Sequence, residues 1–370
     1  MNPDAKRFGR GTKFISVMDI LNNQFICYDN IRASVEVMDG DIDTYGVNYG
    51  DILFQRSSET LEDVGQANVY LDSKPAIFGG FVIRGKSKGN YNPLFFRYLL
   101  ASPTARKRII VKGAGAQHFN IGQDGLSKVS LDIPCMQEQK KIGELLQCID
   151  ARIATQNKII EDLKKLKSAI SKYLFARKDL LETTICLSNI ATLKNGYAFQ
   201  SGKYNALGKW KILTITNVPG ERYINDEDCN CIINLPNDIQ DHQVLKEGDI
   251  LISLTGNVGR VSLCKNGNYL LNQRVGLLQL AKNVNQEFLY QILSSQRFEN
   301  SMIACGQGAA QMNIGKGDVE NYVLPYSSNG NNILWVAKIL HSYDECIINE
   351  LRRLTLLTMQ KQYLLTQMFI

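Results

Sequence analysis

The chain carries the same pattern twice, and this duplication constrains its fold more than any other feature. A glycine-rich turn, an Asn-Ile step, an Ile-Pro or Leu-Pro step and a long amphipathic segment occupy residues 113–175, and the same succession returns at 306–369. Upstream, the sequence GDIL stands at 50–53 and again at 248–251. A duplicated unit predicts two similar surfaces at a fixed separation. Few ligands other than a linear polymer offer two such sites.

Both long segments repeat apolar residues at alternating steps of three and four, which is typical of a helix with one narrow apolar seam. Polar residues interrupt the seam at matching places, and Lys167 and Lys361 form one such pair. Because a lone helix cannot bury such a seam, we expect the two helices to pair as an antiparallel coiled coil. The alternative is that each helix packs only on its own domain. The two lysines either fix the register of the pair or extend from the edge of the seam to solvent.

Composition limits the class of protein. With 370 residues, 44% of them hydrophobic, the chain can build about two to three domains with real cores, and the duplication favours two. A net charge of +6 is compatible with a polyanionic partner. We expect no membrane span, because no run of about eighteen apolar residues occurs. Nine cysteines without paired spacing fit the reducing cytoplasm, and the single Cys229-x-Cys231 pair is weak evidence for zinc.

Short β-branched runs, separated by Gly, Asn and Asp, alternate with helical patterns, which predicts an α+β fold with mixed β-sheets. Within the two globular parts, we expect one helix at about 93–108 and another at about 286–301. The expected division, in chain order, is a first globular domain at 1–135, a first long helix at 136–178, a second globular domain at 179–328 and a second long helix at 329–370.

No motif that carries catalysis or holds a metal stands out. Residues 310–317 come close to a phosphate-binding loop, but Ala310 replaces its opening glycine and Gly317 replaces the hydroxyl residue that holds magnesium. The Phe-Gly-Gly-Phe sequence at 78–81 resembles a cofactor-binding turn only faintly. With three histidines in the chain, no Ser-His or paired-carboxylate arrangement is evident. We therefore expect no catalytic residue and no metal site in a chain that recognises a ligand.

In their order and duplication, these motifs resemble the specificity subunits of type I restriction-modification systems. The residues that carry the resemblance are the two GDIL strands, the glycine-rich turns with Asn-Ile, the Ile-Pro-x-x-x-Glu-Gln junction at 133–139 and the Leu-Lys-Asn-Gly-Tyr-Ala-Phe sequence at 193–199. The resemblance covers nearly the whole chain. It implies two tandem target-recognition domains, each followed by a long α-helix.

The resemblance also implies a function. Each domain would read one half of a bipartite, asymmetric target in double-stranded DNA, and the paired helices would act as a spacer. The subunit would assemble with two methyltransferase subunits, with or without a translocating nuclease subunit. Methylation would be at adenine N6, with S-adenosylmethionine bound by the methyltransferase and ATP and Mg²⁺ by the nuclease subunit, so that this chain itself holds no cofactor. A two-headed adaptor for proteins and a degenerate DNA methyltransferase or nuclease are the alternatives.

The chain departs from the family pattern in two places. The second junction reads Leu-Pro-Tyr-Ser-Ser-Asn-Gly at 324–330 and lacks Glu-Gln. The first domain begins near Lys13, whereas the second has some two dozen residues before the matching Lys211. The first domain therefore lacks its opening strand and loop. A natural short form, a misplaced start and a permuted chain in which another segment completes the domain all remain open.

Sequence is read by side chains that reach base edges in the major groove, while lysines, arginines and backbone amides hold phosphates. We expect the loops after the GDIL strands, the glycine-rich turns and the 193–199 segment to face DNA. Arg56 and Arg260 are hypothesised to bind guanine, and Gln55 or Asn257 adenine. The full set of predicted DNA-binding residues is Gln55, Arg56, Ser57, Ser58, Lys112, Gln117, His118, Asn120, Lys194, Asn195, Tyr197, Thr255, Asn257, Arg260, Gln311 and Asn313.

The long helices carry two sets of apolar residues with different expected roles. We expect one set, the seam, to join the helices to each other. The seam is Leu146, Ile149, Ile153, Ile160, Leu163, Ile170, Leu340, Ile347, Leu354, Leu357 and Leu364. We expect the other set, the off-seam stripe, to face the methyltransferase subunits. The off-seam stripe is Leu145, Ile159, Leu166, Leu351 and Leu356.

Overall fold

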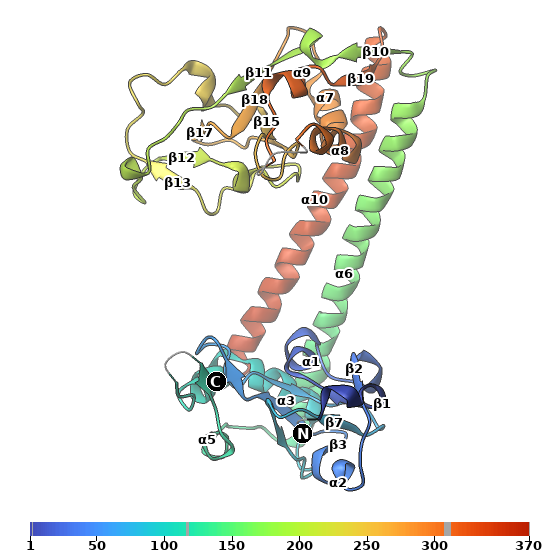
Figure 1. Cartoon of the computed structure of the whole chain (residues 1–370), viewed down its shortest axis with the longest axis vertical. Helices are drawn as coiled ribbons and strands as arrows, with labels where there is room; N and C mark the ends of the chain where they lie inside the picture. The colour runs from blue at the N-terminus through green and yellow to red at the C-terminus, as the bar shows by residue number, and fades with distance from the viewer. Residues whose placement is uncertain (2, 116–117, 307–311, 370) are drawn as a thin grey trace. The chain divides into compact units, whose positions relative to one another are not determined.

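The computed structural model describes residues 1, 3–115, 118–306 and 312–369 (Figure 1). It divides into two compact units, unit 1 formed by Met1–Asn157 and Arg352–Ile370, and unit 2 formed by Lys158–Leu351. Each unit combines mixed β-sheets with short helices, as the expected α+β class requires. Among these residues, no helix combines the length and the apolar character needed to cross a membrane.

Unit 1 contains two principal sheets. In the first, β1 pairs antiparallel with β2 and parallel with β7, in the order β2-β1-β7-β3; the bounds are β1 (Phe8–Ile15), β2 (Ala33–Val35), β3 (Gly46–Val47) and β7 (Ala76–Phe78). The second has the order β6-β4-β8, with β4 (Ile52–Gln55), β6 (Ala67–Val69) and β8 (Val82–Gly85). The side chains of Ile15, Leu53 and Tyr70 are fully buried in one core cluster, which explains why β-branched and aromatic residues recur in these short runs.

Unit 2 repeats both sheets with one addition. Its first sheet has the order β13-β12-β17-β14, with β12 (Trp210–Leu213), β13 (Asn230–Ile232), β14 (Val244–Leu245) and β17 (Tyr269–Leu271). Its second has the order β11-β18-β15-β16, with β11 (Ala191–Asn195), β15 (Ile250–Ser253), β16 (Val261–Leu263) and β18 (Val275–Leu280). In the described part of unit 1, β8 has no counterpart of β11 beside it.

The repeated GDIL sequence has the same geometry in both units. Gly50 and Gly248 adopt left-handed backbone angles, with φ of +88° and +87°. Only glycine enters this region without a steric cost, so the residue permits the sharp turn into β4 and β15. The following aspartate of unit 1, Asp51, is buried and accepts backbone hydrogen bonds from Asn48 and Ser87. It thereby fixes the start of the strand.

The two helices expected within the globular parts are each broken into two. Unit 1 has α3 (Pro93–Ala101) and α4 (Pro103–Ile110), and unit 2 has α7 (Gln286–Leu293) and α8 (Gln296–Cys305). In unit 1 the break lies at Ser102, which is extended (ψ 151°) because the residue before a proline is pushed out of the helical region. In unit 2 it lies at Ser295, which is also extended (ψ 148°). The prediction of one continuous helix was wrong in both places.

The long helices α6 (Met136–Ala176) and α10 (Gly330–Gln367) pack on each other within each unit. In unit 1, Leu146 and Ile149 of α6 share a core with Leu365 near the end of α10. In unit 2, Leu174 near the end of α6 shares a core with Leu340 in the first part of α10. The first part of α6 thus packs with the end of α10 in unit 1, and the end of α6 packs with the first part of α10 in unit 2. The helices also pack on the globular parts, and Phe95 shares the core of Leu146 and Ile149 in unit 1.

Two ion pairs account for the lysines in the apolar seam. In unit 1, Lys361 Nζ lies 2.6 Å from Asp150 Oδ1; in unit 2, Lys167 Nζ lies 2.6 Å from Asp344 Oδ1. Both aspartates are buried, and neither lysine is fully exposed. The two lysines are 194 residues apart, and so are the two aspartates, so the contact obeys the internal repeat. A half-buried lysine that pairs with a buried aspartate of the other helix favours one register, which is the first of the two roles considered for these residues.

Candidate nucleic-acid interface

The loop after the GDIL strand meets the asparagine of the Asn-Ile step in both units. In unit 1, β5 (Ser57–Ser58) pairs with β9 (Phe119–Asn120), and Ser57 Oγ donates a hydrogen bond to the Asn120 side chain. In unit 2, Thr255 Oγ1 donates to Asn313 Oδ1 at 3.0 Å, and the two residues form a β-bridge. Two segments that were predicted separately to contact a ligand are therefore neighbours, and each unit presents one combined surface.

A turn that sequence reasoning did not select lies beside this surface. In unit 1 the 79–82 turn is closed by a hydrogen bond from Val82 N to Gly79 O (3.0 Å), and Phe81 O accepts from Arg56 N (2.9 Å). Phe81 is 68% exposed. The Phe-Gly-Gly-Phe sequence drew attention to the turn, but only as a faint cofactor motif.

Unit 2 contains the same turn with different side chains. The 272–275 turn is closed by Val275 N to Asn272 O (2.9 Å), and Arg274 O accepts from Leu254 N (3.0 Å). Gln273 and Arg274, at its centre, are both exposed. The backbone of the two surfaces is therefore repeated, whereas the side chains at the turn are not.

The 193–199 segment adds a third part to the surface in unit 2. Tyr197 N donates to Leu271 O (2.8 Å), and Gln273 N donates to Tyr197 O (3.0 Å), so the segment lies against the 272–275 turn. The Tyr197 hydroxyl donates to Asp238 at 2.8 Å, and this hydrogen bond raises the pKa of the phenol. On β11, Lys194 and Asn195 stand opposite Leu277 and Gly276 of β18.

The structure sorts the predicted DNA-binding residues by exposure. The exposed ones are Arg56, Lys112, His118, Asn120, Asn195, Asn257 and Asn313. Those of intermediate exposure are Ser57, Ser58, Lys194, Tyr197, Thr255 and Arg260. Gln55 is buried, and its amide donates to Ser57 O at 2.8 Å, so its side chain is occupied by the loop itself. Gln117 and Gln311 lie outside the described residues.

Several basic side chains near the surface already have partners. Arg260 forms an ion pair with Glu299, with 3.5 Å between Nε and Oε1. Arg106 donates to the backbone oxygens of Glu62 and Val64, both at 2.8 Å, and so holds the loop after β5. Arg108 donates to Ser130 O at 2.8 Å. These contacts leave Lys107 and Lys112 as the exposed cations of the neighbouring segment 106–112.

Gly115 is required by the geometry of its turn. Its φ is +148°, and a Cβ atom at this position would lie 1.9 Å from His118 O. Any side chain would therefore displace the backbone of the glycine-rich turn. The next described residue, His118, is exposed and Asn120 follows it two positions later. The glycine thus shapes the turn that presents Asn120 beside Ser57.

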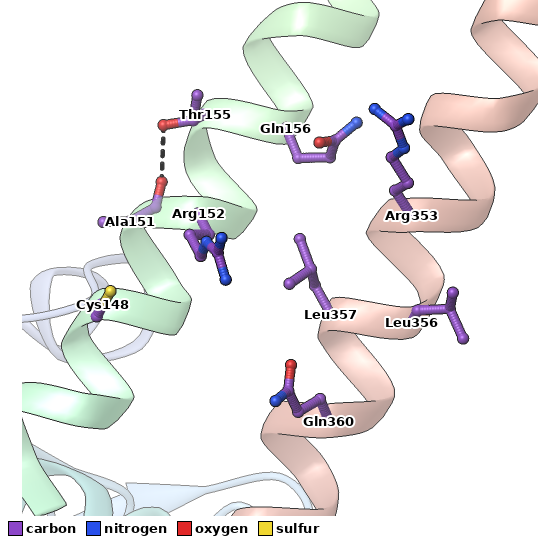
Figure 2. A pocket seen from close by; sticks show the side chains of 9 residues that line it. All are labelled: Cys148, Ala151, Arg152, Thr155, Gln156, Arg353, Leu356, Leu357 and Gln360. Carbon is purple, nitrogen blue, oxygen red and sulfur yellow. Dashed lines mark hydrogen bonds between the residues drawn. The ribbon is translucent and has the colours of Figure 1, made fainter.

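A groove lies between α6 and α10 within unit 1 (Figure 2). Its volume is about 570 Å³, and Figure 2 shows the side chains that line it: Cys148, Ala151, Arg152, Thr155 and Gln156 on α6, and Arg353, Leu356, Leu357 and Gln360 on α10. Leu356, a member of the off-seam stripe, is 65% exposed. Leu145, Ile159 and Leu166 of the stripe are also exposed, whereas Leu351 is half-buried. Apolar side chains thus remain open on the helices after the seam is buried.

The chain shows no preformed metal centre in the residues that the structure describes: none of their His, Cys, Asp and Glu side chains form a group of three that could hold an ion. Cys231 lies on β13 and Cys229 directly precedes that strand. Burial is the largest cause of the raised pKa of Cys229, which reaches about 11. The pair therefore has the environment of half-buried strand residues.

Comparison with known proteins connects this architecture to a family. Residues 1–165 and 182–359 both match the type I restriction modification DNA specificity domain. The MjaVIII specificity subunit of a type I restriction enzyme from Methanocaldococcus jannaschii is 26% identical over 281 residues, which are 69% of this chain and 63% of that protein. The putative MjaX specificity subunit from the same organism is 24% identical over 309 residues, 78% of this chain and 71% of that protein. The chain thus spans less than two thirds of the length of the MjaVIII subunit.

Solved structures share the fold. The S subunit of a type I restriction-modification system from M. genitalium superposes with a TM-score of 0.55 at 16% identity, covering 99% of this chain and 94% of that one. A chain from a study of complex assembly and conformational transition of the type I restriction-modification system superposes with a TM-score of 0.57 at 13% identity, covering 90% and 85%. With two matched segments that together span most of its length, the chain belongs to the family of type I restriction-modification DNA specificity domains, of which it carries two in tandem.

Proposed function

We propose that the chain is the DNA-specificity subunit of a type I restriction-modification complex and that each unit reads one half of a bipartite, asymmetric target. One observation carries the proposal: the backbone pairing of Ser57 with Asn120 is repeated by Thr255 with Asn313, while the exposed side chains around it differ. A repeated frame with unlike side chains is what reading two different half-sites requires.

Recognition in each half-site divides between base edges and phosphates. Arg56 in unit 1 is exposed at the strand end, where a guanidinium can donate to guanine O6 and N7. Asn257 in unit 2 is exposed on the loop after β15, where an amide can pair with adenine. Lys107 and Lys112 supply charge for phosphates, so DNA affinity should fall as salt rises.

Assembly with other subunits forms the second part of the proposal. Two methyltransferase subunits bind the paired helices, hold S-adenosylmethionine and transfer its methyl group to adenine N6. A translocating nuclease subunit, where it joins, supplies ATP and Mg²⁺ chemistry. This chain contributes no catalytic group, and the complex acts in the cytoplasm. Support comes from the apolar residues that stay exposed on α6 and α10, chiefly Leu166 and Leu356.

The helices have a further role in the proposal, as an antiparallel coiled coil that sets the spacing between the two half-sites. The support is local to each unit. The seam residues Leu146 and Ile160 on α6 and Leu340 and Ile347 on α10 are all buried. Leu146 and Ile160 are 14 positions apart and Leu340 and Ile347 are 7 apart, so each pair is separated by whole heptads, as knobs-into-holes packing requires.

The experiment is co-expression of the chain with a type I methyltransferase subunit encoded beside it, in a host without other adenine methylation, followed by methylome sequencing. We expect N6-methyladenine in one bipartite, asymmetric motif. A variant with Ser57→Ala and Asn120→Ala should change one half of the motif, and Thr255→Ala with Asn313→Ala the other. Methylation without a bipartite motif, or no methylation in spite of a stable complex, would contradict the proposal. An adaptor for proteins would give the second result.

A further inference from the structure

The 79–82 and 272–275 turns occupy equivalent places in the two units. In each turn the amide of the fourth residue donates a hydrogen bond to the carbonyl oxygen of the first. The carbonyl oxygen of the third residue accepts a hydrogen bond from the amide of the residue directly after β4 or β15. By these two contacts Phe81 corresponds to Arg274, although the two residues share no chemical property. The sequence does not reveal this correspondence, because the first two positions of the turn are Gly79 and Gly80 in unit 1 but Asn272 and Gln273 in unit 2.

The exposed side chain of Phe81 does not pack into the core of unit 1. Its neighbours Val82 and Ile83 are 4% and 8% exposed and enter the core, whereas Phe81 stays open at the tip of the turn. Arg274 is open at the same place even though unit 2 has β11 and Tyr197 beside its turn. The position is therefore exposed in both units, near the paired hydroxyl and amide of Ser57 and Asn120 or their counterparts.

We propose that this turn position selects a base in each half-site: Phe81 packs on the 5-methyl group of a thymine, and Arg274 donates to O6 and N7 of a guanine, both in the major groove. Thymine is the base that shows a methyl group there, and an aromatic side chain is a suitable apolar contact for it. Guanine is the base whose two acceptors match a guanidinium. The inference rests on the proposed function and assigns one base contact to each unit.

The test uses the complete complex with its methyltransferase and duplexes that carry the motif found for the wild type. Replacing one thymine by deoxyuridine removes only the 5-methyl group. At one position of one half-site, we expect this change to lower the methylation rate about fourfold, which corresponds to ~0.8 kcal/mol for a buried methyl group. In Phe81→Ala the same replacement should have no effect, and Phe81→Leu should keep part of it.

Arg274→Ala should reduce the preference for guanine at one position of the other half-site by about five- to 150-fold, the range for one bidentate contact. The matched controls are Tyr49→Ala and Arg297→Ala. Tyr49 is an exposed aromatic residue that precedes the start of β4, and Arg297 is an exposed arginine on α8. Both should keep the wild-type motif.

Two outcomes separate this inference from the function on which it rests. If the wild-type complex methylates a bipartite motif but no thymine methyl is sensed through Phe81 and no guanine through Arg274, the assignment of the turn is wrong and the proposed function stands. If the wild-type complex shows no bipartite motif, the proposed function fails and the assignment fails with it.

Discussion

The ion pair between Lys167 and Asp344 allows a quantitative prediction about unit 2. Asp344 is 8% exposed and accepts three hydrogen bonds: from Lys167 at 2.6 Å, from Arg222 at 2.9 Å and from Gln291 at 2.6 Å. Replacing Asp344 by Leu leaves the Lys167 ammonium, which is 17% exposed, without its acceptor. Arg222 keeps a partner, because Glu287 lies 2.6 Å away. Breaking a buried pair from one side costs about 3–5 kcal/mol, and the residual exposure of the lysine places our expectation near 3 kcal/mol.

Removing both charges should cost much less than removing one. In Lys167→Met with Asp344→Leu, no uncompensated charge remains at the seam, and apolar replacements of a buried pair are often neutral. We therefore expect the second substitution to restore about 2 kcal/mol. The assay is urea unfolding of the full chain followed by tryptophan fluorescence, since Trp210 and Trp335 are the two tryptophans and both belong to unit 2.

A control on the same helix tests whether burial, and not charge alone, is responsible. Lys165 and Glu161 form an ion pair at 2.6 Å, but both side chains are exposed. Lys165→Met should change the free energy of unfolding by no more than about 1 kcal/mol. If the losses from Lys167→Met and Asp344→Leu simply add in the double variant, the two residues are not coupled, and the argument that they fix the register of the helices is refuted.

Three further predictions concern the partner surface, a thiol and acid stability. Leu166→Gln together with Leu356→Gln should abolish co-purification of the methyltransferase while the circular dichroism of the chain is unchanged; retained assembly would count against a partner-facing stripe. Burial raises the pKa of Cys264 to about 12, so at pH 8 iodoacetamide should modify the exposed Cys148 long before Cys264, as mass spectrometry of the peptides can show. Hydrogen bonds from the side chain of Ser327 and from Ser328 lower the pKa of Glu182 to about 2. Its stabilising effect is therefore present above its ordinary pKa of 4.5 and is lost as pH falls toward 2, and Glu182→Gln should flatten the acid side of the fluorescence-monitored stability profile in this window.

Features with a strong local signal could be predicted from the sequence. The seam of the long helices follows from steps of three and four, and its members Leu146, Ile149 and Leu340 are buried. The GDIL strands follow from a glycine turn before a β-branched run. Duplication doubled the information in each pattern, because a weak motif that returns in the same order becomes specific.

Features that depend on distant contacts could not be predicted. The amide of Gln55 is a group that can bind a base, but it donates a hydrogen bond to Ser57 O instead. Arg260 pairs with Glu299, which lies on α8, 39 positions later in the chain. Phe81 lies beside the loop after β4 because its carbonyl oxygen accepts a hydrogen bond from Arg56 N, and sequence spacing does not predict this contact. The helix break at Ser102 can be predicted from Pro103, which follows it, but the apolar periodicity across 93–108 favours one continuous helix.

The lysine–aspartate pairs bear on how such a chain arises. Asp150 and Lys167 stand 17 residues apart on one helix, and Asp344 and Lys361 stand 17 apart on the other. A half-length polypeptide therefore holds both complementary charges, and two copies can satisfy each other isologously about a two-fold axis. The two ion pairs of the present sequence match the contacts that such a pair of identical half-length chains would make. Under the proposed function, a symmetric ancestor of that kind would read palindromes, whereas its fused descendant could change one half-site and keep the other.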